Sequence, residues 1–222
     1  IDLFGLTKSV TGTTIQTGTG DIDVHGSLQT VKPAEGTTLT EGTTQNVTIQ
    51  AGTGNIDLTA TLTDTPVISS LGDAVVQTTT SGGLNVTGAV TAGKLATLSA
   101  TEGNVNLQGA LTASGGKATI SASDKDVDVA NADDDKKGDI TLTGDITSAT
   151  DATSISTNNG AINLQGNASA AKALEIKATN NGSITVGKAK DTAGTHDYTL
   201  SGDTAAISTN SGSIDLYGLT QY

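Results

Sequence analysis

Apolar and polar residues alternate in short stretches along the whole chain, and a glycine stands beside most of these stretches. The segment LSATEGNVNLQGAL (98–111) has the pattern in its clearest form, with Val105 and Leu107 alternating with polar residues and with bends at Gly103 and Gly109. Alternation at period 2 predicts a strand with one buried face, and glycine supplies turns that need a positive φ. The segment therefore predicts short strands joined by tight bends.

The same phrase returns from one end of the chain to the other. It reads IQTGTGDIDVHGSL from Ile15, IQAGTGNIDLTATL from Ile49, ISASDKDVDVANA from Ile120, ISTNNGAINLQGNA from Ile155 and ISTNSGSIDLYGL from Ile207. Where no insertion intervenes, equivalent apolar positions recur at roughly 21 to 22 residues, a period typical of solenoids. We therefore predict an all-β fold, a right-handed parallel β-helix (β-solenoid) of roughly ten rungs with polar loop insertions, in a single segment over residues 1–222. Successive rungs would stack about 4.8 Å apart.

Each rung contributes two apolar residues to a predicted inward ladder. The pairs are Ile22/Val24, Ile56/Leu58, Leu84/Val86, Val105/Leu107, Val127/Val129, Ile140/Leu142, Ile162/Leu164, Ile184/Val186 and Ile214/Leu216. Longer intervals between rungs are explained by polar insertions at 32–45, 63–74 and 189–197. The interval from Val127 to Ile140 is short, so we expect part of a turn to be missing at 131–138. The alternation in 169–178 predicts another strand.

Composition supports a narrow stacked core. The chain has 28 Gly and one Phe and lacks Trp, Met, Cys and Arg, so small β-branched residues must fill the interior. The net charge of −12 repels phosphate backbones, which argues against nucleic-acid binding. The apolar runs are too short for a membrane-spanning helix, so we expect no membrane insertion. Absence of cysteine is compatible with an extracellular setting.

The recurring phrase, as in GDIDVHGSL (20–28), GNVNLQGAL (103–111) and GDITLTGDI (138–146), resembles the rungs of filamentous-haemagglutinin-like exoproteins. Those are large bacterial surface adhesins of the two-partner secretion type, and the likeness covers nearly the whole chain. The family's amino-terminal secretion domain with its Asn-Pro-Asn motifs has no counterpart here, and without arginine there is no Arg-Gly-Asp motif. The resemblance implies a piece of the shaft of a secreted surface adhesin, and neither the part that is secreted first nor the part that binds a receptor.

The residues available for catalysis are few. His25 falls at an outward position of its strand and His196 in a polar insertion, and neither stands in an arrangement that predicts a catalytic triad. Pectate-lyase-like β-helices resemble this architecture, but their chemistry depends on an arginine, which this chain lacks. We therefore predict that the protein is not an enzyme.

Acidic residues recur at the outward position between the two inward apolar residues of a rung. Asp2, Asp23, Asp57 and Asp215 occupy it in four rungs, whereas Asn or Thr occupies it in most others. Stacked rungs bring equivalent side chains to roughly 5 Å, where carboxylates repel. Calcium bridging this row is one hypothesis, and side chains that simply extend into water are the alternative.

A second acidic group combines a strand with a loop. It includes Asp124, Asp126 and Asp133, and oxygen-rich clusters of this kind can hold calcium. Lys125, Lys136 and Lys137 stand among these residues and would neutralise part of their charge, so a solvated loop is the competing interpretation.

The two ends of the chain are nearly the same rung. IDLFGLT (1–7) and IDLYGLT (214–220) differ only at Phe4 and Tyr217, so Ile1, Leu3 and Phe4 could meet Ile214, Leu216 and Tyr217 of another copy. Such a head-to-tail contact does not close and predicts a filament, although tandem repetition within a longer chain would give the same likeness.

We therefore predict a structural and adhesive solenoid of an extracellular or cell-surface protein, with self-association and a host-cell or carbohydrate receptor as partners. One alternative is an ice-binding solenoid, suggested by Thr59-x-Thr61-x-Thr63-x-Thr65 and Thr141-x-Thr143. These threonines do not recur at one fixed rung position, however, as an ice plane would require. A polysaccharide-active β-helix is the third possibility.

Overall fold

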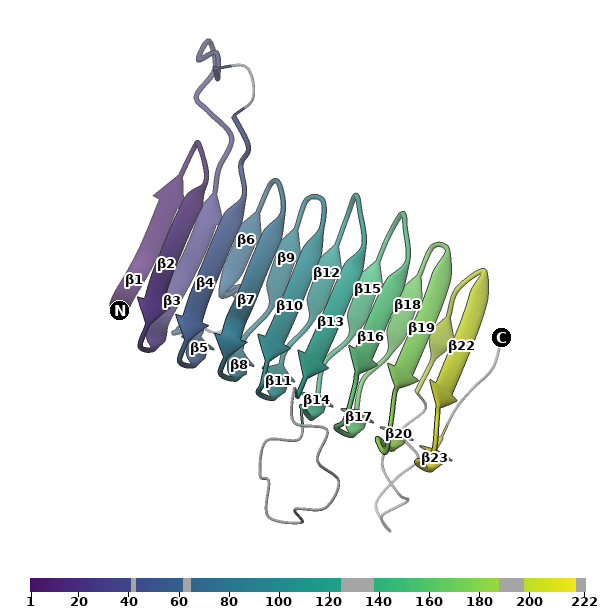
Figure 1. Cartoon of the computed structure of the whole chain (residues 1–222). Coiled ribbons are helices and arrows are strands. Elements are labelled where there is room, and N and C mark those ends of the chain that lie inside the picture. Colours follow the sequence, from purple (N-terminus) through teal and green to yellow (C-terminus); the bar gives the residue numbers. More distant parts are fainter. Residues whose placement is uncertain (41–42, 62–64, 125–137, 188–197, 219–222) are drawn as a thin grey trace.

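The chain forms a parallel β-helix in which every described regular element is a β-strand (Figure 1). The computed structural model describes residues 1–40, 43–61, 65–124, 138–187 and 198–218. These residues contain two sheets, of 15 and 8 strands, and neighbouring strands pair in parallel. The predicted fold class is therefore confirmed.

The eight-stranded sheet forms one long face of the rod. Its strands are β2 (Thr13–Thr19), β4 (Val47–Thr53), β7 (Ala74–Ser81), β10 (Ala96–Thr101), β13 (Ala118–Ser123), β16 (Thr153–Thr157), β19 (Ala173–Ala178) and β22 (Thr204–Thr209).

The 15-stranded sheet is folded into two further faces. The first face comprises β1 (Asp2–Ser9), β3 (Ile22–Thr30), β5 (Ile56–Thr59), β8 (Leu84–Thr87), β11 (Val105–Gln108), β14 (Ile140–Leu142), β17 (Ile162–Leu164), β20 (Ile184–Val186) and β23 (Ile214–Leu216). The second face continues from the end of β3 through β6 (Ile68–Ser70), β9 (Val90–Ala92), β12 (Leu111–Ala113), β15 (Ile146–Ser148), β18 (Ala168–Ala170) and β21 (Leu200–Ser201).

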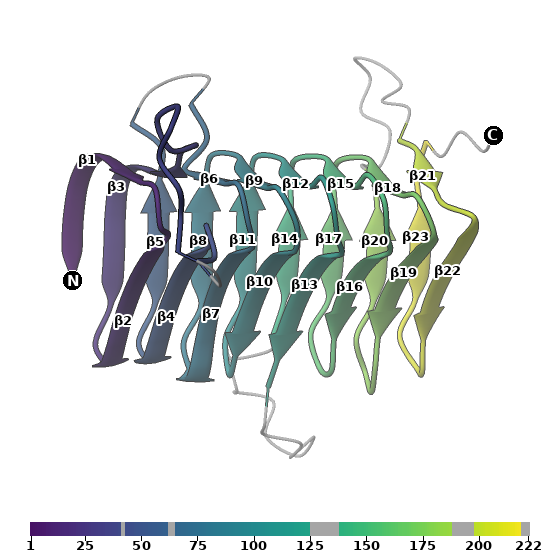
Figure 2. The ribbon, with the colours of Figure 1, turned by 90° about the horizontal axis from the view of Figure 1, so that it is seen from above.

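One coil of the solenoid takes one strand from each face in turn. In the middle of the rod, β10 leads into β11, a bend at Gly109 leads into β12, and the next coil begins with β13. Figure 2 shows these coils side by side along the length of the rod. The same three-strand unit is repeated along the rod, and each coil contacts only its neighbours.

Small aliphatic side chains fill the interior. Leu98, Val105, Leu107 and Leu111 are completely buried, and their partners in neighbouring coils are buried as well. Ile, Val and Leu from one coil stack on the same residue types in the next, which gives the rod one continuous core. Among the described residues, no buried side-chain nitrogen or oxygen lacks a hydrogen-bond partner.

Glycine is required where the chain bends between the first and second faces. A Cβ on Gly144 would lie 2.1 Å from the carbonyl oxygen of Gly109, and one on Gly166 would lie 2.2 Å from that of Gly144. Gly109 itself has a φ of 146° and stands in the same relation to Gly88. The column of glycines therefore lets successive coils approach to strand spacing.

The predicted rung at Val127/Val129 is wrong. Val105 pairs directly with Ile140, and Leu107 with Leu142, so no strand of the first face lies between β11 and β14. The first face has nine strands among the described residues, one fewer than the ten equivalent positions proposed from the sequence. Residues 125–137 lie outside the described part of the chain. The valines of DVDV imitate the alternation of a rung, which explains the error.

Two of the three predicted insertions fall between paired strands, as expected. β3 ends at Thr30 and β4 begins at Val47, so the predicted insertion at 32–45 falls between two paired strands, and residues 32–40 leave the rod at the corner that precedes the eight-stranded sheet (Figure 1); residues 41–42 are not described. Val186 and Leu200 keep their partners in β17 and β18, so the stretch 189–197 is an insertion between two paired strands; residues 188–197 are not described. The predicted bounds of the insertion at 63–74 are too wide, because Ile68–Ser70 within them forms β6 of the second face. The segment 169–178 contributes to β18 and β19, as predicted.

Asn and Asp side chains fasten the corners of successive coils. Asn104 Oδ1 accepts the backbone N–H of Asp139 at 2.8 Å, and Asp139 Oδ1 accepts that of Ala161 at 2.7 Å. The same contact recurs at the next corner, where Asp145 Oδ1 accepts the N–H of Asn167 at 2.8 Å. An Asx residue directly before a strand therefore binds the equivalent position of the following coil.

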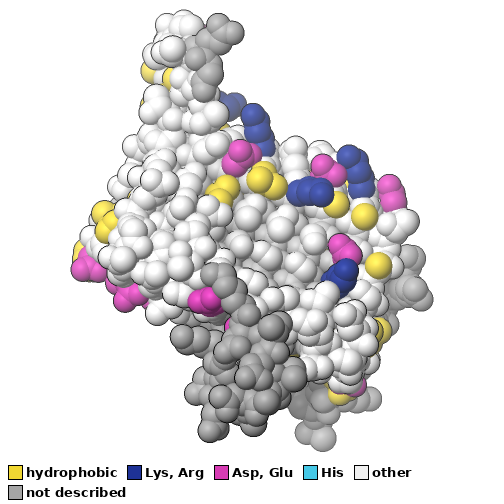
Figure 3. Space-filling model, viewed as in Figure 1, with side chains coloured by type: hydrophobic (Ala, Val, Ile, Leu, Met, Phe, Trp, Pro, Cys, Tyr) yellow, Lys and Arg dark blue, Asp and Glu magenta, His cyan; other side chains and the backbone are white. Residues whose placement is uncertain are grey.

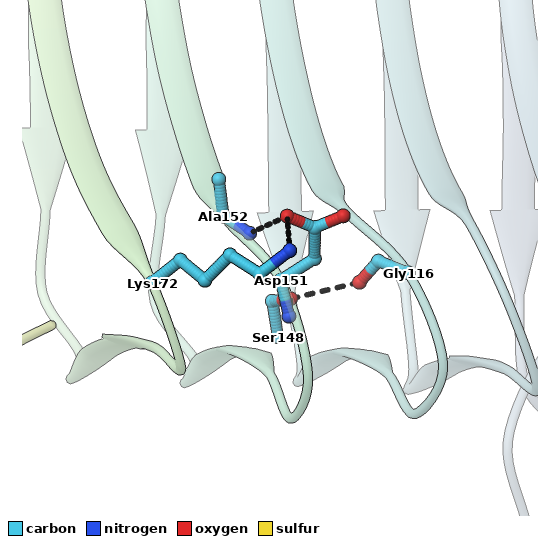
Figure 4. Close-up of polar contacts among 5 residues, drawn as sticks. All are labelled: Gly116, Ser148, Asp151, Ala152 and Lys172. Carbon is cyan, nitrogen blue, oxygen red and sulfur yellow. Dashed lines mark hydrogen bonds and ion pairs between the residues drawn. The ribbon is translucent and has the colours of Figure 1, made fainter. Parts of the chain in front are cut away.

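A different contact fastens the corner shown in Figure 4. Ser148 Oγ donates to the carbonyl of Gly116 at 2.7 Å, and Lys172 Nζ lies 3.2 Å from Asp151 Oδ1. Lys172, together with the N–H of Ala152, lowers the pKa of Asp151 below its ordinary value. Both charged groups are solvent-accessible, so this pair contributes little to stability.

Candidate functional site

The outward acidic row predicted from the sequence is present at the N-terminal end of the rod. Asp2 pairs with Asp23 in the ladder between β1 and β3, and Asp23 pairs with Asp57 in the next. Desolvation, the neighbouring Asp2 carboxyl group and the charges of Asp57 and Asp21 raise the pKa of Asp23 above its ordinary value. The row therefore carries mutual repulsion that protonation relieves.

Amides relieve this repulsion further along the same row. Asn85 Nδ2 donates to Asp57 Oδ1 at 2.6 Å, and Asn106 Nδ2 donates to Asn85 Oδ1 at 2.9 Å. From Asn85 to Thr185 the described residues of this row are uncharged, and Asp215 stands at the far end on β23. Carboxylates of this row are thus confined to the end regions of the rod.

The structure does not gather the predicted calcium ligands into one site. Within the described residues, no three His, Cys, Asp or Glu side chains are grouped closely enough to hold a metal ion. Asp215 is at the opposite end of the rod from Asp2, Asp23 and Asp57. Asp124 is buried, with Asn158 Oδ1 accepting its N–H at 2.8 Å, whereas Asp126 and Asp133 are outside the described residues. Calcium binding stays a prediction.

Apolar and aromatic side chains are exposed at the N-terminal end. Phe4 is 78% exposed, and its ring stacks on that of His25 with centroids 5.1 Å apart. Ile1 and Leu6 are about half exposed, at 49% and 54%, and Leu3 only partly packs against the core. The outer edge of β1 carries no further strand among the described residues.

Apolar and aromatic side chains are exposed at the C-terminal end as well. Ile214 and Leu216 belong to the inward rank of the first face, yet they are 40% and 47% exposed because no described strand follows β23. Tyr217 follows directly and occupies the position that Phe4 and His25 hold at the other end. The six residues predicted as assembly ends are therefore all solvent-accessible, at opposite ends of the rod.

Three of the surface hollows in the described part of the chain have polar side chains in their linings. One, of about 420 Å³, is lined mainly by glycines and by Asn55, Asn85, Asn104 and Asn106, with one carboxylate, Glu102. A second, of about 440 Å³, lies over β13, β16 and β19 and is lined mainly by Ser and Thr, together with Glu175 and Lys177. The third, of about 320 Å³, includes Leu6 and Lys8. Their side chains can donate and accept hydrogen bonds. His196 is outside the described residues.

Regular ranks of hydroxyl and amide groups cover the outer face of the eight-stranded sheet. One rank comprises Thr14, Thr48, Val75, Thr97, Thr119 and Ser154 and continues as Glu175 on β19. The neighbouring rank comprises Gln16, Gln50, Gln77, Ser99, Ser121 and Ser156 and continues as Lys177 on β19. Ser121 Oγ donates to Ser99 Oγ at 2.9 Å. Uncharged polar groups accordingly dominate the middle of the face in Figure 3.

Sequence reasoning missed these ranks. It sought threonine pairs on the first face, where Thr59 and Thr141 occupy different outward positions of their rungs. The signal was nevertheless present in the stretches TTIQ, VTIQ, ATLS, ATIS and TSIS, which place Thr or Ser before a buried aliphatic residue and Gln or Ser after it. The corner ladders of Asn and Asp were missed too, and their signal is an Asx residue directly before the strand.

Comparison of the chain with models of protein families, with curated proteins and with solved structures finds no match. No helix among the described residues is long and apolar enough to cross a membrane.

Proposed function

We propose that this chain is a non-enzymatic structural segment of an extracellular or cell-surface protein, a stiff rod that stacks end to end with further copies. The observation that carries the proposal is the equivalence of the two ends. β1 and β23 are the same rung in sequence, and each exposes apolar side chains beside a strand edge that carries no further strand among the described residues.

Unpaired edges of parallel strands favour addition of further strands. The inward residues Ile214 and Leu216 lose contact with water once another coil covers them, and burial of apolar surface contributes about 25 cal/mol per Å². The contact joins one end of a copy to the opposite end of the next, so it repeats without closing and produces a filament.

An adhesive role is supported by the placement of the insertions. Residues 32–40 project from one corner while the strands on either side of the insertion, β3 and β4, keep their places in the sheets (Figure 1). A loop that leaves a stiff rod in this way can change in sequence without disturbing the core. The proposed binding partners of such loops are a host-cell or carbohydrate receptor.

Negative-stain electron microscopy and sedimentation velocity of the purified chain at micromolar concentration test this function. The expected result is long, uniform fibres whose length increases with concentration. Leu216→Asp should reduce them to single short rods, because it places a charge on the inward rank of the exposed end. The matched control is Leu71→Asp, a change at a similarly exposed leucine away from the ends. Short rods for the wild-type chain at every concentration would overturn the proposal.

A second candidate function, ice binding, is favoured by one observation. One rank of the eight-stranded sheet presents hydroxyl groups in register on β2, β4, β10, β13 and β16, with Val75 of β7 as an interruption, and adjacent strands are spaced by about 4.8 Å. A thermal-hysteresis measurement tests this function. Thr119→Tyr, which disrupts a rank, should abolish a hysteresis that Asn106→Tyr on the first face leaves unchanged, and no hysteresis in the wild-type chain would exclude the function.

A further inference from the structure

We propose that end-to-end stacking occurs by strand replacement, in which β23 of one copy takes the place of β1 on β3 of the next copy while β22 adds to β2. This inference rests on the proposed end-to-end stacking and specifies its contact. Adding a strand to an exposed sheet edge is an established mode of protein association, and exchange of an equivalent element between copies is a low-cost route to it.

Among the described residues, the coil that contains β1 has no strand in the eight-stranded sheet. β1 pairs with β3 in the large sheet, but the described eight-stranded sheet begins only with β2, which belongs to the same coil as β3 (Figure 2). If β23 simply added to the outer edge of β1, β22 and β2 would lie two strand spacings apart, about 9 to 10 Å. The inward residues Ile15 and Ile207 would then face a gap in the wall of the rod.

Replacement of β1 closes both sheets at once. Ile207 precedes Ile214 by seven positions, and Ile15 precedes Ile22 by seven positions. Both members of each pair belong to the inward ranks of their sheets. With β23 on β3, the connection between the strands therefore brings β22 onto β2 in register. Ile207 then stacks on Ile15, and Ile214 on Ile22.

The sequence of β23 fits the position of β1. Ile214–Leu216 has the same sequence as Ile1–Leu3, so β23 can reproduce the contacts that residues 1–3 make with β3. Tyr217 would stack on His25 where Phe4 now lies, 5.1 Å away between ring centroids. Asp215 would face Asp23, as Asp2 does now.

β1 is held less completely than the strands further along the rod. It pairs with one neighbour only, most of its side chains are exposed, and its Asp2 faces the like-charged Asp23. The incoming copy restores the contacts to β3 and adds the pairing of β22 with β2, which covers Ile207, Ile214 and Leu216, whereas Ile15 is already buried. Strand replacement therefore has a net gain in buried apolar surface.

A reversible covalent lock on β1 tests the mechanism. The chain has no cysteine, so Asp2→Cys with Asp23→Cys introduces a single disulfide between direct ladder partners. Parallel partners lie at about 4.8 Å, within the Cα separation that a disulfide accepts. The matched control is Asn85→Cys with Asn106→Cys, the same rank and the same kind of partners in the middle of the rod.

Assembly is followed by sedimentation velocity and electron microscopy under oxidising and reducing conditions. The expected result is that the oxidised Asp2/Asp23 lock prevents fibres, that reduction restores them, and that the control assembles in both conditions. Equal assembly of the locked and reduced forms would overturn strand replacement while leaving end-to-end stacking in place.

A second variant separates slow exchange from an absence of stacking. Deletion of residues 1–8 frees the edge of β3 and should accelerate assembly at least tenfold. If neither the wild-type chain nor this variant assembles at any concentration, both the stacking and the mechanism are wrong.

Discussion

Val105 of β11 and Ile140 of β14 are direct partners in the parallel ladder, although they stand far apart in the sequence. Asp124 and Gly138, at the two borders of the undescribed stretch between them, lie close together. A Cβ on Gly138 would be 3.3 Å from the backbone nitrogen of Asp124. Thr157 Oγ1 donates to the carbonyl of Gly138 at 2.7 Å, so the next coil holds this border.

Deletion of residues 125–137 should therefore leave the solenoid intact. The joined sequence would read ISASDGDITLTGDI, which has the length and pattern of LSATEGNVNLQGAL (98–111). Since loop closure contributes only about 0.6 kcal/mol per doubling of loop length, the melting temperature should change by no more than a few degrees. Circular dichroism melts of the two chains measure this, and loss of cooperative unfolding would show that the deleted stretch belongs to a coil.

The glycine column between the first and second faces should tolerate no side chain. Gly144→Ala would place a methyl group 2.1 Å from the Gly109 carbonyl oxygen, and relief requires the two coils to separate. Overpacking of this kind costs about 1 to 3 kcal/mol, which should appear as a lower midpoint in urea unfolding. The control is Gly18→Ala, where a Cβ meets no atom within 4 Å. Equal stability of both variants would contradict the role of the column.

The raised pKa of Asp23 makes a pH-dependent prediction. Burial and the neighbouring Asp2 and Asp57 carboxyl groups favour the protonated form in the folded state. The contribution of Asp23 to stability is therefore fully present below its unfolded pKa and is lost as the pH rises through the raised folded value. Asp23→Asn should consequently raise the melting temperature at pH 7, where the carboxylate is charged, and change it little at pH 3.

The amide is a suitable replacement because Asn85 and Asn106 occupy the same rank further along the rod. Differential scanning calorimetry at both pH values measures the effect. Asp139→Asn serves as a control for the change in net charge, since it retains the oxygen that accepts the N–H of Ala161 and matches Asn104 in the preceding coil. A gain of equal size at pH 3 and pH 7 would mean that repulsion in the row is not its cause.

The fold could be predicted because its signals are local and repeated. The pair Val105 and Leu107 carries the same period-2 signal as Ile162 and Leu164, and stacking turns that signal into a ladder. The prediction of a rung at Val127 is wrong because alternation of apolar and polar residues alone does not show which segment pairs with the neighbouring coil. Pairing depends on which segment reaches the neighbouring coil, and β14 rather than the DVDV stretch does so.

The candidate site at the two ends of the rod could be predicted only in part from the sequence. Equivalence of the two end rungs is visible in IDLFGLT and IDLYGLT, and their exposure follows once the order of strands is known. Which faces are complete at each end is a property of the coil as a whole. That the coil of β1 has no strand in the described eight-stranded sheet therefore became apparent only from the arrangement of β1, β2 and β3.

The inward ranks should be the most sensitive positions of the rod. Val105→Asp places a carboxylate in a fully buried position between Leu84 and Ile140, both of which are also buried and apolar. Without a partner the charge cannot be compensated, so the coils on either side must separate or the carboxyl group must stay protonated. We expect loss of cooperative unfolding at pH 7, measured by circular dichroism and limited proteolysis.

The adjacent residue provides the matched control for that change. Asn106→Asp introduces the same side chain one position further along β11, on the outward rank, where water solvates it. It should unfold cooperatively within a few degrees of the wild-type chain, with a small loss from repulsion and from the hydrogen bond that Asn106 donates to Asn85. Because strand alternation alone distinguishes the two positions, equal damage from both substitutions would contradict the inward and outward assignment of the whole first face.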